Sequence, residues 1–312
     1  MKFHFGLGKF FTTFDKSHRD VMRMSIEAGF GIHYCLDYPG SGQFFKKMTS
    51  ARERSSVKAI TRVPCFNIDV LHSEVDLTLK TLGLEQIDTL QLWGGDEVFD
   101  IFNTDSVLYR ELLILKKEGK INNFLPQLYY DQTIKLNDIV QANTPFVFYG
   151  SPVGLHVNKN ILESKDLKHS IAMSIFGGVD KLVKPIFDND DELEYWNQIK
   201  EKYSWTEICL MNLKNFEWIE KVVGTTGSKK HMEEIVSYFL NQPKIENADL
   251  LNKISIQSCS QEHMAVQNAE KRWLENNKRL RSKKVYIKSL AYHYIKKNNA
   301  IHNVIDKLTG RG

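Results

Sequence analysis

Residues 73–93 read SEVDLTLKTLGLEQIDTLQLW, and this stretch carries the pattern that decides the fold. Ser73–Leu82 has apolar residues at helical spacing, and Gly83 follows as a residue that commonly ends a helix. Ile87–Trp93 is then a short apolar run of the length of a buried strand. A helix that passes directly into a buried strand is typical of a parallel α/β sheet, because parallel strands need crossover connections.

The same alternation extends in both directions along the chain. Helices are predicted over 18–28, 106–117, 133–141 and 206–213, and strands over 31–36, 57–63, 121–128, 145–149, 170–175 and 221–224. Eight such units favour an α/β fold of the (β/α)8 TIM barrel type over an open sheet, since such a barrel needs about 250 residues. No Gly-x-Gly-x-x-Gly follows the first predicted strand, so a Rossmann fold loses its best evidence.

The residues after Pro243 break this rhythm. We predict a barrel over 1–243 and a helical, basic extension over 244–312 that packs on or beside it. Residues 271–312 hold twelve Lys and Arg and two acidic residues, which gives this segment a net charge of +10. Because the whole chain carries +4, the residues before it carry −6. The simplest expectation is that the helices of the extension pack over one end of the barrel and leave a basic face in solvent. Contact with a partner protein or an acidic ligand is the alternative, and nucleic acid is disfavoured because tyrosines among lysines form no motif.

Several classes of protein and site are disfavoured by what the chain lacks. It starts without the apolar run of a signal peptide and has no apolar stretch long enough for a membrane helix, which predicts a cytoplasmic protein. Its four cysteines form no Cys-x-x-Cys pair, so we expect reduced thiols and no metal. The acidic run 188–192 lacks the alternation of a calcium loop and predicts a loop or a helix start.

Several segments resemble the aldo-keto reductases in order and spacing. They are EAGFGIHY at 27–34, VKAITRV at 57–63, LKTLGLEQIDTLQLW at 79–93 and VVGTTGSKKHMEE at 222–234. The resemblance covers most of residues 3–240. It implies a barrel that binds NADP(H) and reduces a small carbonyl or sugar-like substrate.

The resemblance also places two catalytic positions, and both carry unusual residues. In that family a lysine lowers the pKa of the tyrosine acid, and a histidine orients the substrate. Arg62 stands at the lysine position and Trp93 at the histidine position. An arginine keeps the positive charge but cannot give up its proton, whereas an indole neither titrates nor accepts a hydrogen bond. This departure predicts a non-standard, degenerate active site.

The positions of the family's aspartate and tyrosine depend on the loop after the strand 31–36. Asp37 and Tyr38 take these roles if the loop is shortened, whereas a count from Gly29 places Tyr34 and Pro39 there. Both registers stay open. The run 39–42, Pro-Gly-Ser-Gly, predicts a turn at this point. A carboxylate partner is expected for a buried Arg62, and Asp37 or Asp96 could supply it.

The two ends of the implied cofactor site are matched unequally. At the phosphate end the resemblance implies these binding residues: Ser174, Phe176, Gly177, Gly178, Gly224, Thr225, Thr226, Lys230, Glu233 and Glu234. At the nicotinamide end the family's polar and stacking residues are replaced by Gln127, Leu128, Val147 or Phe148, and Met173. A phosphate end of this kind favours a nucleotide or phosphorylated ligand more securely than it favours nicotinamide chemistry.

Three functions remain open at this stage. The first is a diverged, NADP(H)-dependent oxidoreductase that uses Tyr38 or Tyr34 as acid and Arg62 as electrostatic support. The second is a catalytically inactive barrel, a pseudoenzyme, that senses a ligand or binds a partner, because a fold can persist when its site does not. The third is an isomerase or lyase for a phosphorylated ligand, with Asp37, Asp96, Glu97 or His33 as acid and base.

Overall fold

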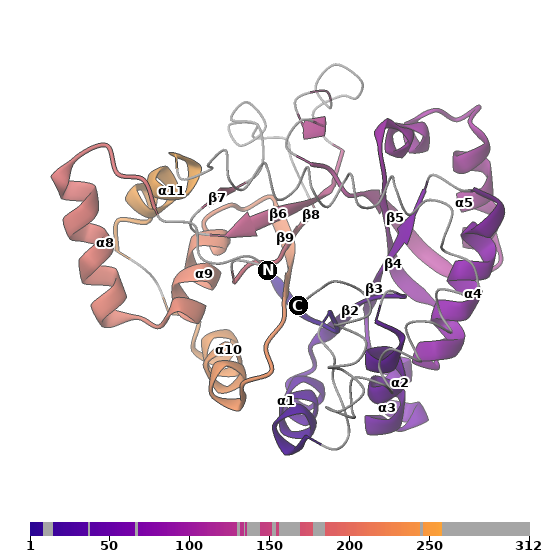
Figure 1. Ribbon diagram of the computed structural model, residues 1–312, viewed down its shortest axis with the longest axis horizontal. Helices are drawn as coiled ribbons and strands as arrows, with labels where there is room; N and C mark the ends of the chain where they lie inside the picture. Colours follow the sequence, from indigo (N-terminus) through magenta and orange to yellow (C-terminus); the bar gives the residue numbers. More distant parts are fainter. Residues whose placement is uncertain are drawn as a thin grey trace, which may run out of the picture.

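Eight parallel strands form the central sheet of the computed structural model (Figure 1). The structure describes residues 1–8, 15–36, 38–65, 68–129, 132–133, 135, 144–151, 154–155, 169–176, 185–243 and 246–257. The parallel strands are β1 (Lys2–Gly6), β2 (Gly31–Cys35), β3 (Ala59–Pro64), β4 (Ile87–Trp93), β5 (Ile121–Pro126), β6 (Val147–Ser151), β8 (Ser170–Met173) and β9 (Ile219–Gly224). The two-residue strand β7 (Gly154–Leu155) pairs antiparallel with β6.

The strand order is that of a barrel. The parallel strands follow one another as β5-β4-β3-β2-β1-β9-β8-β6. A parallel bridge between Gln127 and Val147 joins the two ends of this series, and Leu128 N–H donates to the Val147 carbonyl at 2.8 Å. The (β/α)8 barrel predicted from the sequence is therefore confirmed.

Helices surround the sheet on its outer side (Figure 1). They are α1 (Lys16–Glu27), α2 (Pro39–Met48), α3 (Ala51–Ser56), α4 (Leu71–Leu82), α5 (Val107–Lys117), α8 (Asp190–Lys202), α9 (Trp205–Lys214), α10 (Lys229–Asn241) and α11 (Ala248–Gln257), with 3-10 turns η1 (Ile68–Val70) and η2 (Asp96–Phe102). Most of their buried apolar side chains join one cluster with the outward-facing side chains of the strands.

Local signals explain where several of these elements begin and end. Gly83 ends α4 in the left-handed conformation, with φ of 68°. Ser204 opens α9 with a capping box, in which its hydroxyl and the Glu207 carboxylate satisfy each other's backbone N–H groups. Asn189 caps α8, so the acidic run 188–192 is a helix start, as expected.

Two features differ from the sequence-based expectation. The run 39–42 is the first turn of α2, because Pro39 at the first helical position has the φ that a helix needs and lacks only an N–H that would be unbonded. The strand β1 was not predicted, although four of its five residues are buried. The predicted helix 133–141 lies largely outside the described residues.

Side chains inside the barrel are arranged in layers, because alternate residues of each strand point inward. An apolar cluster lies in the middle and consists of Ile60, Val147, Ile171, Met173 and Val223, with Leu125 and Tyr149 packed against it. Polar residues stand two positions away along the same strands. They include Lys221 toward the amino ends and Arg62 toward the carboxyl ends. The barrel therefore has two polar ends and an apolar middle.

The described part of the predicted extension is α11. Leu251 and Ile254 pack with Trp196 of α8 and Ile208 of α9. The Ser255 hydroxyl donates to the Ser151 carbonyl at 3.1 Å, which joins α11 to the carboxyl end of β6. The boundary after residue 243 stays a prediction, and residues 258–312 lie outside the described residues.

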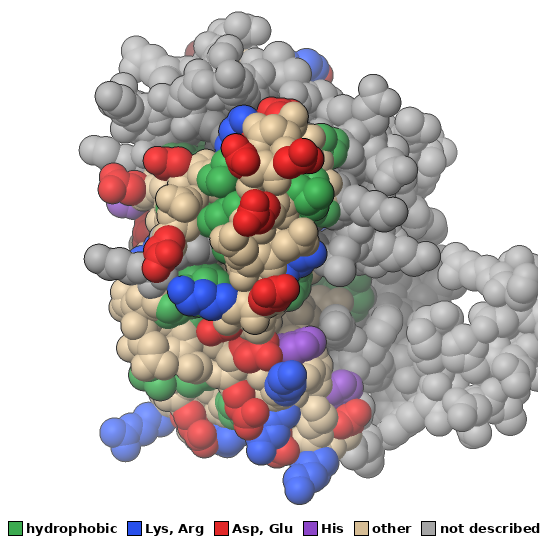
Figure 2. Space-filling view, turned by 90° about the vertical axis from the view of Figure 1, so that its left-hand side faces the viewer, with side chains coloured by type: hydrophobic (Ala, Val, Ile, Leu, Met, Phe, Trp, Pro, Cys, Tyr) green, Lys and Arg blue, Asp and Glu red, His purple; other side chains and the backbone are tan. Residues whose placement is uncertain are grey.

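The face of the molecule that carries α8 is rich in Asp and Glu side chains (Figure 2). The exposed acids of α8 are Asp190, Asp191, Glu194 and Glu201. Within the part of the chain that is described, no helix is long and apolar enough to cross a membrane.

Candidate active site

The carboxyl ends of the strands form one mouth of the barrel, and Arg62 and Trp93 meet there. Arg62 points inward from β3 and pairs in register with Cys35 of β2 and Gln91 of β4. Its guanidinium carbon lies 4.0 Å from the centroid of the Trp93 ring, and the Trp93 side chain is fully buried. The negative face of an indole attracts a cation, and the ring shields one side of the guanidinium from water. The fold thus brings together the two catalytic positions that the resemblance assigned.

A chain of hydrogen bonds crosses the interior beside this pair. His33 Nε2 lies 2.9 Å from Gln91 Oε1, Gln91 Nε2 donates to Gln127 Oε1 at 2.6 Å, and Gln127 Nε2 lies 3.3 Å from the Tyr149 hydroxyl. The amide of Gln127 can only donate through its nitrogen, so the Tyr149 oxygen accepts. The hydrogen-bond chain therefore reaches the Tyr149 phenol, two residues beyond Val147 toward the carboxyl end of β6.

His33 serves this chain as a neutral donor. Burial lowers its pKa to about 4, the hydrogen bond with Gln91 raises it, and the positive charge of Arg62 lowers it. The imidazole is therefore uncharged near neutral pH. Since Gln91 offers its carbonyl oxygen, the proton of His33 belongs on Nε2. His33 orients Gln91, which is a different task from the acid or base role considered for it.

The residues after β2 are now placed in part. Tyr38 is the residue that precedes α2, it is half-buried, and its N–H donates to the Cys35 carbonyl at 3.2 Å. Asp37 lies outside the described residues. Tyr34 is fully buried among the helices, and a Cβ on Gly42 of α2 would lie 2.9 Å from its ring. Tyr34 therefore faces away from the mouth, which removes it as a proton donor there.

Asp96 and Lys135 form a surface ion pair beside the mouth. The Lys135 Nζ lies 2.8 Å from Asp96 Oδ2, and both side chains are about half exposed. Asp96 therefore has a cationic partner in Lys135, and its proposed pairing with Arg62 stays a prediction.

The phosphate end predicted from the resemblance surrounds the start of α10. The Thr226 hydroxyl accepts from Ser228 N–H at 3.0 Å, and the Ser228 hydroxyl in turn accepts from His231 N–H at 3.4 Å. Lys230 is exposed in the first turn and makes no ion pair with the described residues, whereas Lys229 lies 3.7 Å from Glu233. A helix N-terminus with an available ammonium group suits an anion, so these residues fit a phosphate of a cofactor.

Four other predicted cofactor residues have crowded surroundings or an unusual backbone conformation. A Cβ on Gly224 would overlap the Phe176 ring, and the Phe176 carbonyl accepts from Trp205 Nε1 at 3.2 Å. Ser174 has a positive φ of 56° at the end of β8. Thr225 is half-buried, and a Cβ on Gly6 of β1 would overlap its hydroxyl. Glu233 and Glu234 lie on α10, and Gly177 and Gly178 lie outside the described residues.

The nicotinamide end has a mixed character. Gln127 is a buried amide at the mouth, but it is bonded to Gln91 and Tyr149. Met173 is nearly buried and accepts from Gln91 Nε2 at 3.4 Å. Leu128 and Phe148 are fully buried in the outer core, and Val147 belongs to the interior cluster. Among the described residues, no group of three or more His, Cys, Asp or Glu side chains could hold a metal.

Sequence reasoning missed the roles of Gln91 and Tyr149. The signal that could have found Gln91 is its spacing, because it stands two residues before Trp93 in a buried strand and so points to the same side. A fully buried glutamine in such a strand needs a polar partner. Its partners come from three other strands, which no local pattern names.

Comparison with known proteins supports the fold. No family model and no curated protein matches the chain. Among solved structures, an aldo-keto reductase from Bacillus halodurans in its holo form has a TM-score of 0.59 at 15% identity, covering 84% of this chain and 95% of that one. An aldo/keto reductase from Brucella melitensis has a TM-score of 0.56 at 17% identity, covering 81% and 94%.

A third similar structure is an aldo-keto reductase complexed with NADPH, and the same reductase is described from the silkworm Bombyx mori. The NADPH complex has a TM-score of 0.55 at 13% identity, covering 81% of this chain and 84% of that one. These similarities span the barrel and confirm, at the level of the fold, the resemblance that the sequence segments carry. The chain shares the fold of the aldo-keto reductases.

Proposed function

We propose that the protein is an NADP(H)-dependent oxidoreductase that reduces a small carbonyl or sugar-like substrate at the carboxyl mouth of the barrel. The observation that carries the proposal is the Arg62 guanidinium, held over Trp93 beside a hydrogen-bond chain that ends on the Tyr149 phenol. The fold supports it, since similar structures are aldo-keto reductases and one is complexed with NADPH.

Arg62 is the electrostatic group of the proposed reaction. When bound, NADPH supplies the hydride that reduces the carbonyl carbon. Negative charge then develops on the carbonyl oxygen, and a fixed guanidinium stabilises that charge more strongly than water does. Because an arginine keeps its proton at all accessible pH values, the proton for this oxygen must come from another group.

Tyr149 is the proton donor that the geometry favours. Its oxygen accepts from Gln127, which fixes a phenol near the carboxyl end of β6, where it could give its proton to a substrate oxygen. Tyr38, at the start of α2, is the donor that the sequence resemblance favours, and both phenols belong to the same rim of the barrel.

The start of α10 would hold the phosphate of the cofactor. Lys230 would bind the 2′-phosphate that distinguishes NADPH from NADH, while Thr226 and the first turn of the helix keep the loop in place. The arrangement predicts a preference for NADPH over NADH.

The test is a titration of the protein with NADPH, followed by tryptophan fluorescence and by reduced-nicotinamide emission. NADH and adenosine 2′,5′-bisphosphate are the reference ligands. We expect NADPH to bind most tightly, and Lys230→Gln to weaken it about tenfold, as the loss of a hydrogen bond to a charged group does.

Lys229→Gln is the matched control, because it removes the same charge one residue away from an ammonium that already pairs with Glu233. It should leave NADPH affinity nearly unchanged. If NADPH fails to bind at millimolar concentration, or binds no better than the bisphosphate, the oxidoreductase proposal is wrong.

A further inference from the structure

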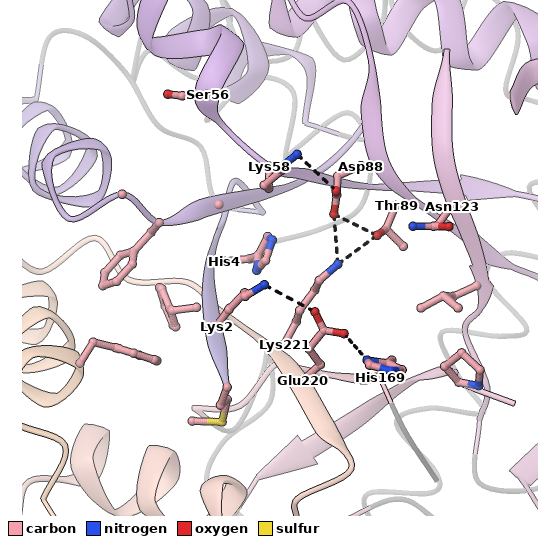
Figure 3. A pocket seen from close by; sticks show the side chains of 18 of the residues that line it. Lys2, His4, Ser56, Lys58, Asp88, Thr89, Asn123, His169, Glu220 and Lys221 are labelled. Carbon is pink, nitrogen blue, oxygen red and sulfur yellow. Dashed lines mark hydrogen bonds and ion pairs between the residues drawn. The ribbon is translucent and has the colours of Figure 1, made fainter. Parts of the chain in front are cut away.

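A pocket lies at the end of the barrel opposite the candidate active site, where the strands begin (Figure 3). It has a volume of about 800 Å³. Its polar lining comes from several strands: His4 of β1, Asp88 and Thr89 of β4, Asn123 of β5 and Lys221 of β9. Enzymes with this fold place their active sites at the carboxyl ends of the strands, so a charged cavity at the amino ends is not explained by the proposed reaction.

A nearly buried ion pair forms the floor of this pocket. Lys221 Nζ lies 3.0 Å from Asp88 Oδ2 and 3.3 Å from the Thr89 hydroxyl. The side chains of Lys221 and Asp88 are only 14% and 15% exposed. Burial raises the pKa of Asp88, but the hydrogen bond and charge of Lys221 outweigh it, and the net pKa is below its usual value. Asp88 is therefore ionised, and Lys221 already balances its negative charge.

His4 presents a neutral imidazole to the same pocket. The residue is 2% exposed, and among the described residues its ring nitrogens have only a weak contact with the Lys2 backbone and no hydrogen bond of good geometry. Burial, followed by the charge of Lys221, lowers its pKa to about 3. A Cβ on Gly31 would overlap the ring, so only glycine leaves His4 this position. Buried polar atoms without partners are costly in a finished core, and a ligand would satisfy them.

The remaining charges favour an anion. Glu220 lies 2.8 Å from His169 and 3.8 Å from Lys2, and Asp88 is paired with Lys221. The three lysines of the pocket, Lys2, Lys58 and Lys221, outnumber its two carboxylates by one. Lys2 and Lys58 lie on the rim, 75% and 72% exposed, and Lys58 reaches Asp88 only at 3.9 Å. These long contacts leave both ammonium groups able to turn toward a ligand. The groups not fully bonded thus include two ammonium groups and the single N–H of the His4 imidazole.

The rest of the lining is apolar. Phe30, Phe124 and Pro145 lie around the pocket together with Leu125 and Phe239. A ligand that fills this volume would therefore need an apolar body as well as a group that accepts hydrogen bonds.

We propose that this pocket binds a small organic anion, a carboxylate or phosphate monoester on an apolar body, with its charged group between His4 and the rim lysines. The site is independent of the cofactor site, which lies at the other end of the barrel. The apolar cluster around Ile60 and Val147 stands between the two ends.

The experiment follows the side-chain nitrogens of His4 by NMR in the full-length protein labelled with 15N-histidine. Benzoate and phenyl phosphate are the anionic probes, and benzyl alcohol and benzylamine are the neutral and cationic references. Saturating NADPH is present throughout and occupies the proposed cofactor site, so that binding of a probe at that site does not contribute to the shift of His4.

We expect a saturable shift of the His4 resonances with both anions at sub-millimolar to millimolar concentration, and binding about tenfold weaker for benzyl alcohol. The double variant Lys2→Gln with Lys58→Gln should weaken the anions about tenfold, because both lysines are exposed and their removal spares the fold. Lys117→Gln removes an exposed lysine on α5, and as the control it should have no effect.

Three results would overturn the proposal. The first is a His4 signal that responds to neither anion up to millimolar concentration. The second is a shift that benzyl alcohol reproduces at the same concentration, and the third is a shift that the rim double variant leaves unchanged. Failure of NADPH to bind would contradict the proposed reaction alone, since the His4 titration reports on a different end of the barrel.

Discussion

At the scale of the residue, Arg62 and Trp93 stand where the aldo-keto reductases carry a lysine and a histidine. The pair explains how both residues can be replaced while a positive charge stays at the site. An arginine is larger than a lysine, flat, and more weakly hydrated, so an aromatic ring is a suitable neighbour. Trp93 supplies that ring at 4.0 Å. The two replacements therefore support each other, which a comparison of either position alone would miss.

We predict that Arg62→Met lowers the rate constant of carbonyl reduction by about 10² to 10³, as the loss of one group that stabilises an oxyanion does. Steady-state kinetics with NADPH and a panel of small aldehydes would measure it. NADPH affinity should change little, because the phosphate end is on α10. An unchanged kcat in this variant would exclude Arg62 from the chemistry.

The two candidate phenols can be separated by substitution. Tyr149→Phe should lower kcat by about 10² to 10⁴ and abolish the basic limb of the pH profile if Tyr149 is the acid. Tyr38→Phe is the matched variant, since it removes the same hydroxyl from the start of α2. A loss in Tyr38→Phe with full activity in Tyr149→Phe would reverse the assignment.

At the scale of the element, close packing of α2 decides how the chain leaves β2. Gly42 lies on the face of α2 that meets β2 and α4. An added Cβ there would lie 2.8 Å from Thr81 and 2.9 Å from the Tyr34 ring. Glycine at this position therefore lets α2 pack closely against Tyr34 and Thr81.

Gly42→Ala should therefore destabilise the protein by about 1–3 kcal/mol despite the better helix propensity of alanine, because the crowded core must shift. Urea unfolding followed by circular dichroism would measure this. Gly8→Ala is the control, since no atom of the described residues lies within 4 Å of the added methyl group. Equal urea midpoints for the two variants would contradict this prediction and would show that α2 can move outward without a loss of stability.

Sequence patterns predicted most elements because their signals are local. The helix before β4 and β4 itself follow from apolar spacing, the stop at Gly83 and the length of the run. The strand β1 was missed since five residues beside the chain start show too little periodicity. The first turn of α2 was misread because Pro, Gly and Ser are typical of turns, while Pro is equally suited to a helix start.

At the scale of the whole molecule, the barrel interior carries two buried histidines in different layers. Burial lowers the pKa of His4 to about 3, with Lys221 contributing, and that of His33 to about 4, with Arg62 contributing. Both pKa values are below the ordinary 6.5, so the unfolded chain binds more protons than the folded one at acidic pH. Neither histidine lowers the stability above about pH 6.5, and stability is lost as the pH falls toward 4 through His33 and toward 3 through His4.

We predict that the free energy of unfolding falls by about 1 kcal/mol per pH unit for each histidine as the pH drops below 6.5. Urea titrations across this range would give the slope. His33→Gln should reduce the slope, whereas the exposed His231→Gln should leave it as in the parent protein. A parent slope that His33→Gln does not change would contradict the assignment for His33.

The sequence by itself determined the barrel class, the order of its elements, and the candidate positions Arg62 and Trp93, because helix and strand periodicity and short motifs are local properties of the chain. Only the tertiary structure decided that His33, Gln91, Gln127 and Tyr149 form one hydrogen-bond chain. It also decided that His4, Asp88 and Lys221 share a pocket at the other end. These residues come from different strands, and their meeting depends on strand register and on closure between Gln127 and Val147, which no local pattern encodes.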